Sequence, residues 1–129
     1  MRFVMMVIYE SRALDAVPKA AAVAKMMEYN KALQKAGVLL AFDGLCPPST
    51  AARISYADGK PTVTGGPFAE TIEVVSGYWI IQVRSREEAI EWAKRAPMSN
   101  NELIEVRQIH EMPDFPEVAE GFEHQNVVH

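Results

Sequence analysis

The apolar residues of this chain fall into short runs typical of strands and into stripes typical of amphipathic helices. The runs predict four strands, over Arg2–Tyr9, Val38–Phe42, Tyr78–Val83 and Leu103–Ile109. One helix is expected between Pro18, which suits the first helical turn, and Gly37, which suits the left-handed residue that ends a helix. A second helix should begin at Ser85 and end before Pro97.

The start of the second helix carries a capping box, Ser85-Arg86-Glu87-Glu88. The Ser85 oxygen should accept from the Glu88 amide, and the Glu88 carboxylate should reach back to the Ser85 amide. Residues repeating at three- and four-residue steps should face the core: Val23, Met26, Met27, Asn30 and Leu33 in the first helix, and Ala89, Trp92, Ala93 and Ala96 in the second.

Between the second and third strands lies a predicted hairpin. Its arms are Ala51–Tyr56 and Pro61–Thr64, and Asp58-Gly59 lies at the centre of its turn. Asp43-Gly44 before it indicates another turn, and 65–76 after it has the composition of a loop. The hairpin therefore has the character of an insertion between two strands.

Without the insertion, the element order is βαββαβ, which predicts an α+β, ferredoxin-like domain with both helices on one face of an antiparallel sheet. The strands over Arg2–Tyr9 and Tyr78–Val83 are apolar on both alternations. A large bare apolar face is rare in a soluble monomer. We therefore expect the open face to pack against a second copy in a twofold homodimer.

Composition and charge narrow the class of protein. The 129 residues, 49% of them hydrophobic and 23% charged, predict one domain over 1–112 and an irregular tail over 113–129. A formal net charge of -4 with no basic cluster argues against nucleic acid. The run Phe3–Tyr9 is too short to span a membrane, and the single Cys46 fits a reducing cytoplasm, so we expect a soluble cytoplasmic protein.

The run Thr64-Gly65-Gly66-Pro67-Phe68-Ala69-Glu70-Thr71-Ile72-Glu73, followed by Gly77-Tyr78-Trp79-Ile80-Ile81, resembles the signature of the DGPF-type, YCII-related proteins. Gly65 stands where that family has its naming aspartate, and Ile72 stands at a position that is usually basic. The resemblance extends over roughly residues 1 to 110. It implies a subunit of the dimeric α+β barrel class, with a histidine and an aspartate near a cleft. Some members are encoded beside alternative sigma factors, which implies a regulatory role as an alternative.

Four residues are candidates for acid–base chemistry. Glu70 and Glu73, three positions apart, would share a face of a helical turn, where one carboxyl can acquire a raised pKa. His110 ends the last strand and has a side chain suited to proton transfer near neutral pH, and Asp43 could pair with it. We expect Glu70 or Glu73 within a side-chain length of His110 or Asp43, in the same subunit or across the dimer. The alternatives are that Glu70 caps local amides and Glu73 is a solvated charge. His110 would then be a structural histidine and Asp43 a turn residue.

Phe68, Thr71 and Tyr78 are candidates for binding a substrate, with the aromatic rings lining an apolar pocket. We expect no metal, because His124 and His129 lie in the tail, and no nucleotide cofactor, because Gly65-Gly66-Pro67 lacks phosphate-loop spacing. Two hypotheses follow. The chain is a small-molecule-handling protein using carboxylate and histidine acid–base chemistry without metal or redox cofactor, or a non-catalytic dimeric binding or regulatory protein.

Overall fold

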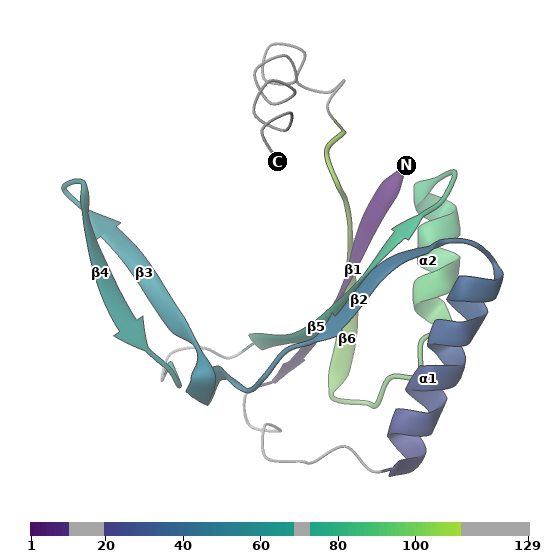
Figure 1. Cartoon of the computed structure of the whole chain (residues 1–129), viewed down its shortest axis with the longest axis horizontal. Helices are drawn as coiled ribbons and strands as arrows, with labels where there is room; N and C mark the ends of the chain where they lie inside the picture. The colour runs from purple at the N-terminus through teal and green to yellow at the C-terminus, as the bar shows by residue number, and fades with distance from the viewer. Residues whose placement is uncertain (11–19, 69–72, 112–129) are drawn as a thin grey trace, which may run out of the picture.

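A computed structural model describes residues 1–10, 20–68 and 73–111. Four strands form one antiparallel sheet in the order β2-β5-β1-β6: β1 (Arg2–Glu10), β2 (Leu39–Gly44), β5 (Glu73–Gln82) and β6 (Glu102–Gln108). Helices α1 (Ala20–Lys35) and α2 (Arg86–Lys94) lie on the same side of this sheet (Figure 1). The chain is therefore an α+β domain with the ferredoxin-like order, as the sequence predicts.

The insertion is also confirmed. A short 3-10 helix, η2 (Pro48–Thr50), leads into strands β3 (Ala52–Ala57) and β4 (Lys60–Gly65), which form a separate two-stranded sheet. Asp58 and Gly59 connect them, both with positive φ (51° and 78°), the combination that a two-residue type I′ turn requires. The hairpin projects away from the four-stranded sheet (Figure 1).

The core lies between the sheet and the two helices. Phe3, Met5 and Val7 of β1 are buried together with Trp79 and Ile81 of β5. These side chains share one face because Phe3 pairs with Ile81, and Met5 with Trp79. From β6, Ile104 and Val106 pack against the same cluster.

Helix α1 is rotated from its predicted orientation. Its buried residues are Tyr29, Asn30 and Leu33, whereas Val23 and Met27 are 48% and 49% exposed. The expected stripe was wrong at these two positions because Tyr29 packs edge-on against Trp79, with ring centroids 5.2 Å apart, and takes the place of Met27. The Tyr29 hydroxyl donates to the carbonyl oxygen of Trp92 at 2.6 Å, and burial raises its pKa to about 12.

The helix ends agree closely with the sequence signals. Gly37 has φ +73°, and Val38 donates to the Leu33 carbonyl, which closes α1 as a Schellman motif. At α2 the Glu88 amide donates to Ser85 Oγ at 3.1 Å. The return bond differs from the prediction, because the Glu88 carboxylate accepts from the amide of Arg84 rather than from that of Ser85.

Strands β2 and β5 are longer than the sequence indicates. The predicted turn at Asp43-Gly44 does not form, since both residues stay in β2, where Asp43 pairs with Tyr78 and Gly44 with Gly77. The predicted loop 65–76 also ends early, because β5 begins at Glu73. These extensions bring Asp43 into register with the strand that carries Tyr78.

The face of the sheet opposite the helices is only partly covered in the single chain. Val4, Met6, Tyr78 and Ile80 are half-buried there, and Leu103 is exposed. The homodimer expected from this face remains a prediction. Among the described residues, no helix has the length and apolar character needed to cross a membrane.

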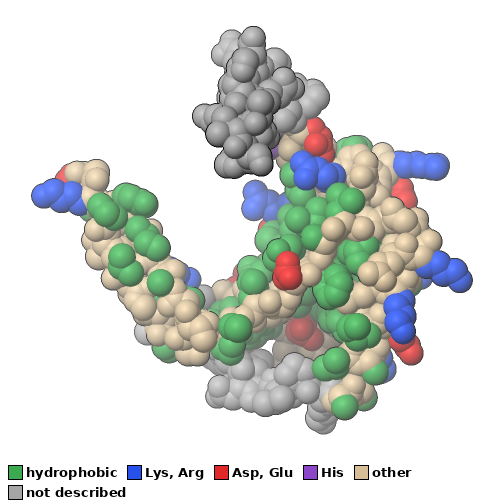
Figure 2. Space-filling model, in the orientation of Figure 1, with side chains coloured by type: hydrophobic (Ala, Val, Ile, Leu, Met, Phe, Trp, Pro, Cys, Tyr) green, Lys and Arg blue, Asp and Glu red, His purple; other side chains and the backbone are tan. Residues whose placement is uncertain are grey.

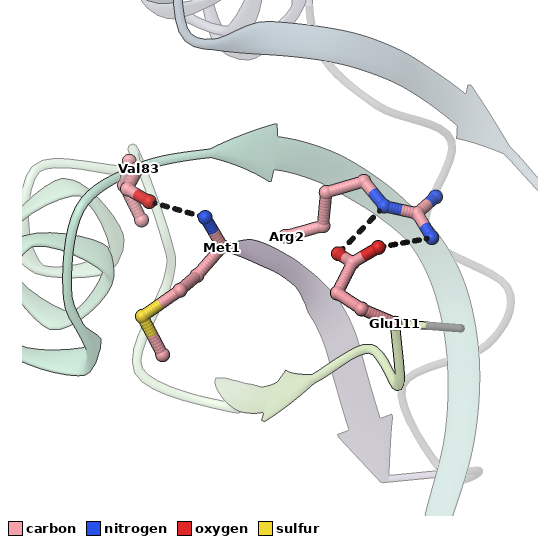
Figure 3. Close-up of polar contacts among 4 residues, drawn as sticks. All are labelled: Met1, Arg2, Val83 and Glu111. Carbon is pink, nitrogen blue, oxygen red and sulfur yellow. Dashed lines mark hydrogen bonds and ion pairs between the residues drawn. The ribbon is translucent and has the colours of Figure 1, made fainter. Parts of the chain in front are cut away.

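The last described residues are held against the start of β1. Arg2 Nε and Nη2 donate to the two carboxylate oxygens of Glu111 at 3.0 and 3.3 Å (Figure 3). Beside this pair, the Met1 amino group donates to the carbonyl oxygen of Val83 at 2.9 Å. The Arg2–Glu111 pair lies next to residue 112, where the predicted domain ends; the expected tail over 113–129 lies outside the described residues.

Candidate functional site

Asp43 and Tyr78 form a hydrogen-bonded pair on the open face of the sheet. The Tyr78 hydroxyl donates to Asp43 Oδ2 at 2.8 Å. The two residues are register partners on neighbouring antiparallel strands, so their side chains leave the same face of the sheet. The structure thus joins one predicted catalytic residue to one predicted substrate-binding residue.

The hydrogen bond to Asp43 changes the acidity of Tyr78. The hydrogen bond to Asp43, followed by the negative charge of that carboxylate, raises the pKa of Tyr78 above the ordinary tyrosine value. Tyr78 therefore stays protonated at neutral pH, and its single O–H is engaged by Asp43. The pair can therefore accept hydrogen bonds from another molecule, through the oxygen lone pairs of the phenol and of the carboxylate.

A cavity of about 200 Å³ lies at the same end of β2 and β5. Its wall is mostly apolar and consists of Leu45, Cys46, Pro48, Ala51, Arg53, Phe68, Val74 and Val75. Leu45 follows β2 directly, and its amide donates to the carbonyl oxygen of Ser76 at 2.8 Å. The cavity is therefore next to the Asp43–Tyr78 pair along both strands, and we call the pair and the cavity together the Asp43–Tyr78 corner.

Arg53 and Phe68 both line this cavity, and Arg53 is its charged residue. The Arg53 guanidinium carbon lies 3.9 Å from the centroid of the Phe68 ring, the geometry of a cation–π contact. Phe68 thus lines this cavity, and its role in binding a substrate stays a prediction. Arg53, which the sequence did not assign to the site, comes from the base of the hairpin.

Glu73 and His110 lie at opposite ends of the sheet. Glu73 pairs with Glu10 at the end of β1, whereas Ile109, next to His110, donates to the carbonyl oxygen of Arg2 at 2.9 Å. The length of β1 between these points is about 26 Å at about 3.3 Å per residue. The two side chains do not meet within one chain, and contact between copies stays a prediction.

Asp43 is also separate from both of these residues. Strands β2 and β6 are the two edges of the sheet, so three strand spacings of about 4.8 Å, or about 14 Å in all, separate Asp43 from the β6 side where His110 lies. Along β5, Glu73 is about 16 Å from Tyr78, the register partner of Asp43. Glu70 and Thr71 lie outside the described residues.

A larger cavity of about 550 Å³ lies at the other end of the sheet, between the start of β1 and α2. Met1, Val38, Arg84 and Glu88 contribute to its wall, and it contains none of the predicted site residues. Its Glu88 carboxylate already accepts a backbone hydrogen bond from Arg84. Over residues 1–10, 20–68 and 73–111, no group of three or more His, Cys, Asp or Glu side chains is arranged to hold a metal ion.

The sheet order, the two helices on one face and the inserted hairpin define a ferredoxin-like α+β domain with a polar pair at one corner of its open face. The model of the YCII-related domain matches residues 1–113, and the chain belongs to this family. A stretch of 66 residues is 35% identical to an uncharacterized protein of Rhizobium meliloti (strain 1021). That stretch spans 51% of this chain and 53% of the relative, about half of each.

Proposed function

We propose that this protein binds a small organic molecule at the Asp43–Tyr78 corner. The observation that carries the proposal is the 2.8 Å hydrogen bond from Tyr78 to Asp43 beside a mostly apolar cavity. Small-molecule sites commonly combine an apolar wall with a few polar groups that orient the ligand. Here Phe68 and Val75 supply apolar wall, and the pair supplies the polar group.

The chemistry of the pair selects the ligand's polar group. Because the Tyr78 proton is engaged by Asp43, the atoms that remain are hydrogen-bond acceptors. A ligand that presents an alcohol or amine donor is therefore preferred over one that presents a carbonyl or carboxylate. The apolar wall favours a donor carried on a compact hydrocarbon or aromatic body.

Catalysis at this corner would use the pair as a base. Asp43 can accept a proton directly, or Tyr78 can take a proton from the ligand while its own passes to Asp43. The raised pKa of Tyr78 makes it a poor acid at neutral pH. Glu70, Glu73 or His110 would join the chemistry only from a second copy or through residues outside the described ranges.

We further propose that the protein works as a homodimer in the cytoplasm. Packing of the open sheet face against a second copy would cover Met6 and Ile80 and enclose the site from water. Cys46 is free and exposed, which is compatible with a reducing compartment.

The test is a thermal-shift screen of small alcohols, amines and matched carboxylates against three proteins: wild type, Asp43→Asn and Tyr78→Phe. We expect alcohols or amines to raise the Tm of the wild type, and the shift to disappear in Asp43→Asn, which turns an acceptor oxygen into a donor. Tyr56→Phe, on the exposed hairpin, is the control and should keep the shift. Compounds that stabilise Asp43→Asn as strongly as the wild type would refute the site.

A non-catalytic dimeric binding or regulatory protein is the second candidate. The observation that favours it is the hairpin, since every residue of β3 and β4 is exposed and available to a protein partner. NMR time courses of the ligands that bind would separate the two functions. A ligand that is consumed by the wild type and not by Asp43→Asn identifies an enzyme, and one that stays unchanged identifies a binding protein.

A further inference from the structure

The Asp43–Tyr78 pair and the neighbouring cavity open on the same face of the sheet. Leu45 lies two positions after Asp43 and still bonds to β5 through its amide, so alternation turns both side chains to one side. On β5, Tyr78 and Val75 pair with positions of β1 that are two residues apart, which places these two side chains on one side as well. A ligand seated in the cavity is therefore on the side from which Asp43 and Tyr78 project.

Backbone contacts hold the wall of the cavity at the base of the hairpin. The Gly66 amide donates to the Ala51 carbonyl at 2.8 Å, and the Ala51 amide donates to the Pro48 carbonyl at 3.0 Å. A Cβ on Gly66 would overlap the Pro48 carbonyl oxygen, so glycine is required for this close approach. Figure 2 shows an open hollow between the hairpin and the body, and the cavity lies where the two join. The start of β3, which carries Arg53, is therefore fixed against the cavity.

Arg53 gives this cavity a positive charge. Of the described residues that line the cavity, Arg53 alone has a charged side chain. Its guanidinium carbon lies 3.9 Å from the centroid of the Phe68 ring, and this contact fixes where the charge lies. A guanidinium has five N–H donors and can hold a carboxylate by two parallel hydrogen bonds. Arg53 can therefore bind an anion in addition to its other contacts in the chain.

Asp43 and Arg53 place opposite charges at two separate positions of one site. Asp43 accepts from Tyr78 at 2.8 Å beside the cavity, whereas Arg53 lies in the cavity wall against Phe68. A molecule with a single polar group matches one of these charges. A molecule with an amine at one end and a carboxylate at the other matches both. The carboxylate adds a contact and does not replace the amine, because the Asp43–Tyr78 pair still needs a donor.

The size of the cavity sets the spacing between the two groups of the ligand. A sphere of about 200 Å³ is about 7 Å across, and Leu45 in the cavity wall lies about 7 Å along the chain from Asp43. The amine and the carboxylate of an α-amino acid are bonded to the same carbon atom, which is too close for them to reach both charges. A chain of several methylene groups separates them and packs on the apolar wall.

We propose that the ligand of the Asp43–Tyr78 corner is an ω-amino acid, whose amine is held by Asp43 and whose carboxylate is held by Arg53. The inference rests on the proposed function and names the substrate class of that same site. Arg53 is then the residue that selects an amino acid over a simple amine. Phe68 keeps the guanidinium in place, and Val75 packs against the methylene chain.

The first experiment measures what the ligand's carboxylate contributes to binding. Isothermal titration calorimetry of the full chain compares δ-aminovalerate with butylamine, which is the same molecule without its carboxylate. The wild type should bind δ-aminovalerate about tenfold or more tightly. In Arg53→Gln the two ligands should bind within about twofold of each other. Lys60→Gln removes the hairpin's other basic side chain, at the turn, and should keep the wild-type preference. Equal loss of the preference in both variants would show a general effect of charge and overturn the Arg53 contact.

An isomer of the ligand tests the spacing. Norvaline has the composition of δ-aminovalerate, but its amine is on the carbon next to the carboxylate. Because it cannot reach both charges, it should bind about tenfold or more weakly than δ-aminovalerate. Norvaline that binds wild type as tightly as δ-aminovalerate would overturn a ligand with separated charges.

A further measurement uses the wild-type chain and so does not depend on the folding of a variant. In nitrogen-15 NMR spectra, the Nε–H signal of Arg53 should move when δ-aminovalerate is added and stay in place when butylamine is added. Movement with both ligands, or with neither, would overturn the contact between Arg53 and the carboxylate.

The substrate class and the proposed function fail separately. If butylamine binds the wild type but not Asp43→Asn, while Arg53→Gln keeps the preference for δ-aminovalerate, the donor site stands and the substrate class is wrong. If δ-aminovalerate depends on Arg53 but binds Asp43→Asn as tightly as the wild type, the cavity holds a carboxylate alone. That result would overturn both the ω-amino acid and the proposed donor site.

Discussion

Trp79 of β5 donates a hydrogen bond of 2.7 Å from Nε1 to Oδ1 of Asn30 on α1, inside the core. Asn30 is buried, and its Nδ2 has no hydrogen-bond partner. A polar contact between helix and sheet therefore satisfies the tryptophan fully and the asparagine only in part. It also helps to fix the rotation of α1, because Asn30 must face Trp79.

This pair predicts a dependence of one substitution on another. Trp79→Phe removes the donor and leaves the whole Asn30 amide buried without a partner, which should lower the free energy of unfolding by about 2 to 4 kcal/mol. Adding Asn30→Leu removes the stranded amide, so the double variant should regain about 1 to 3 kcal/mol. Urea denaturation at one fixed protein concentration measures both effects. Lys31→Ala, on the exposed side of α1, is the control and should change stability by less than about 0.5 kcal/mol.

The order of elements could be predicted because its signals are local. The apolar run of β1, the capping box at Ser85 and the Asp58-Gly59 turn each depend on a few neighbouring residues. The rotation of α1 could not be predicted, because a stripe through Met27 and one through Tyr29 are equally compatible with helical spacing. The choice depends on Trp79, about 50 residues away in the sequence, and on its need for a hydrogen-bond acceptor.

The sequence singles out residues of the candidate site but not their arrangement in space. Phe68 lines the cavity, whereas Tyr78 is not among its lining residues and instead donates to Asp43. Asp43 therefore pairs with Tyr78 and not with His110. The sequence contains Asp43-Gly44, a common turn pair, while β2 in fact continues through it and sets the register with β5. Register between distant strands depends on packing across the whole sheet, which no local motif reports.

The Asp43–Tyr78 pair predicts a shifted tyrosine titration. The pKa of Tyr78 is raised by its hydrogen bond to Asp43, so Asp43→Asn should lower it toward the ordinary value. Carbon-13 spectra of labelled tyrosine follow each ring, and loss of a signal in Tyr78→Phe assigns it. Since the folded-state pKa is raised, the pair stabilises the fold below the ordinary tyrosine pKa, and this is lost as the pH rises through the raised value. An unchanged Tyr78 titration in Asp43→Asn would show that the bond is absent in solution.

The Arg2–Glu111 pair predicts a response at acidic pH. The hydrogen bond from Arg2 lowers the pKa of Glu111 below 4.5, so its stabilisation is present above that value and is lost as the pH falls through the lowered pKa. Arg2→Gln should raise the pKa of Glu111, followed by carbon-13 NMR of the carboxyl. It should also speed hydrogen exchange of the Ile109 amide, which bonds the Arg2 carbonyl. Lys94→Gln, which breaks the exposed Lys94–Glu91 pair on α2, is the control and should leave both unchanged.

Gly77 controls the spacing between β5 and β2 at the candidate site. A Cβ at Gly77 would lie 2.9 Å from the carbonyl oxygen of Asp43 and 3.4 Å from Cα of Gly44, both atoms of the β2 backbone. Backbone cannot move aside as a side chain can, so Gly77→Ala should push β2 outward. We expect a loss of about 1 to 3 kcal/mol in the free energy of unfolding, as for other overpacked positions.

Gly77 is close enough to the candidate site for its substitution to change the Asp43–Tyr78 pair as well as stability. Because Gly77 is next to Tyr78 and its added methyl would press on Asp43, the Tyr78 pKa should fall in Gly77→Ala as it does in Asp43→Asn. Gly44→Ala is the matched control, since a Cβ at this register partner of Gly77 meets nothing within 4 Å. It should change stability by less than about 0.5 kcal/mol and leave the Tyr78 titration in place. If Gly77→Ala behaves like Gly44→Ala in both measurements, close approach of β2 and β5 does not hold the Asp43–Tyr78 pair together.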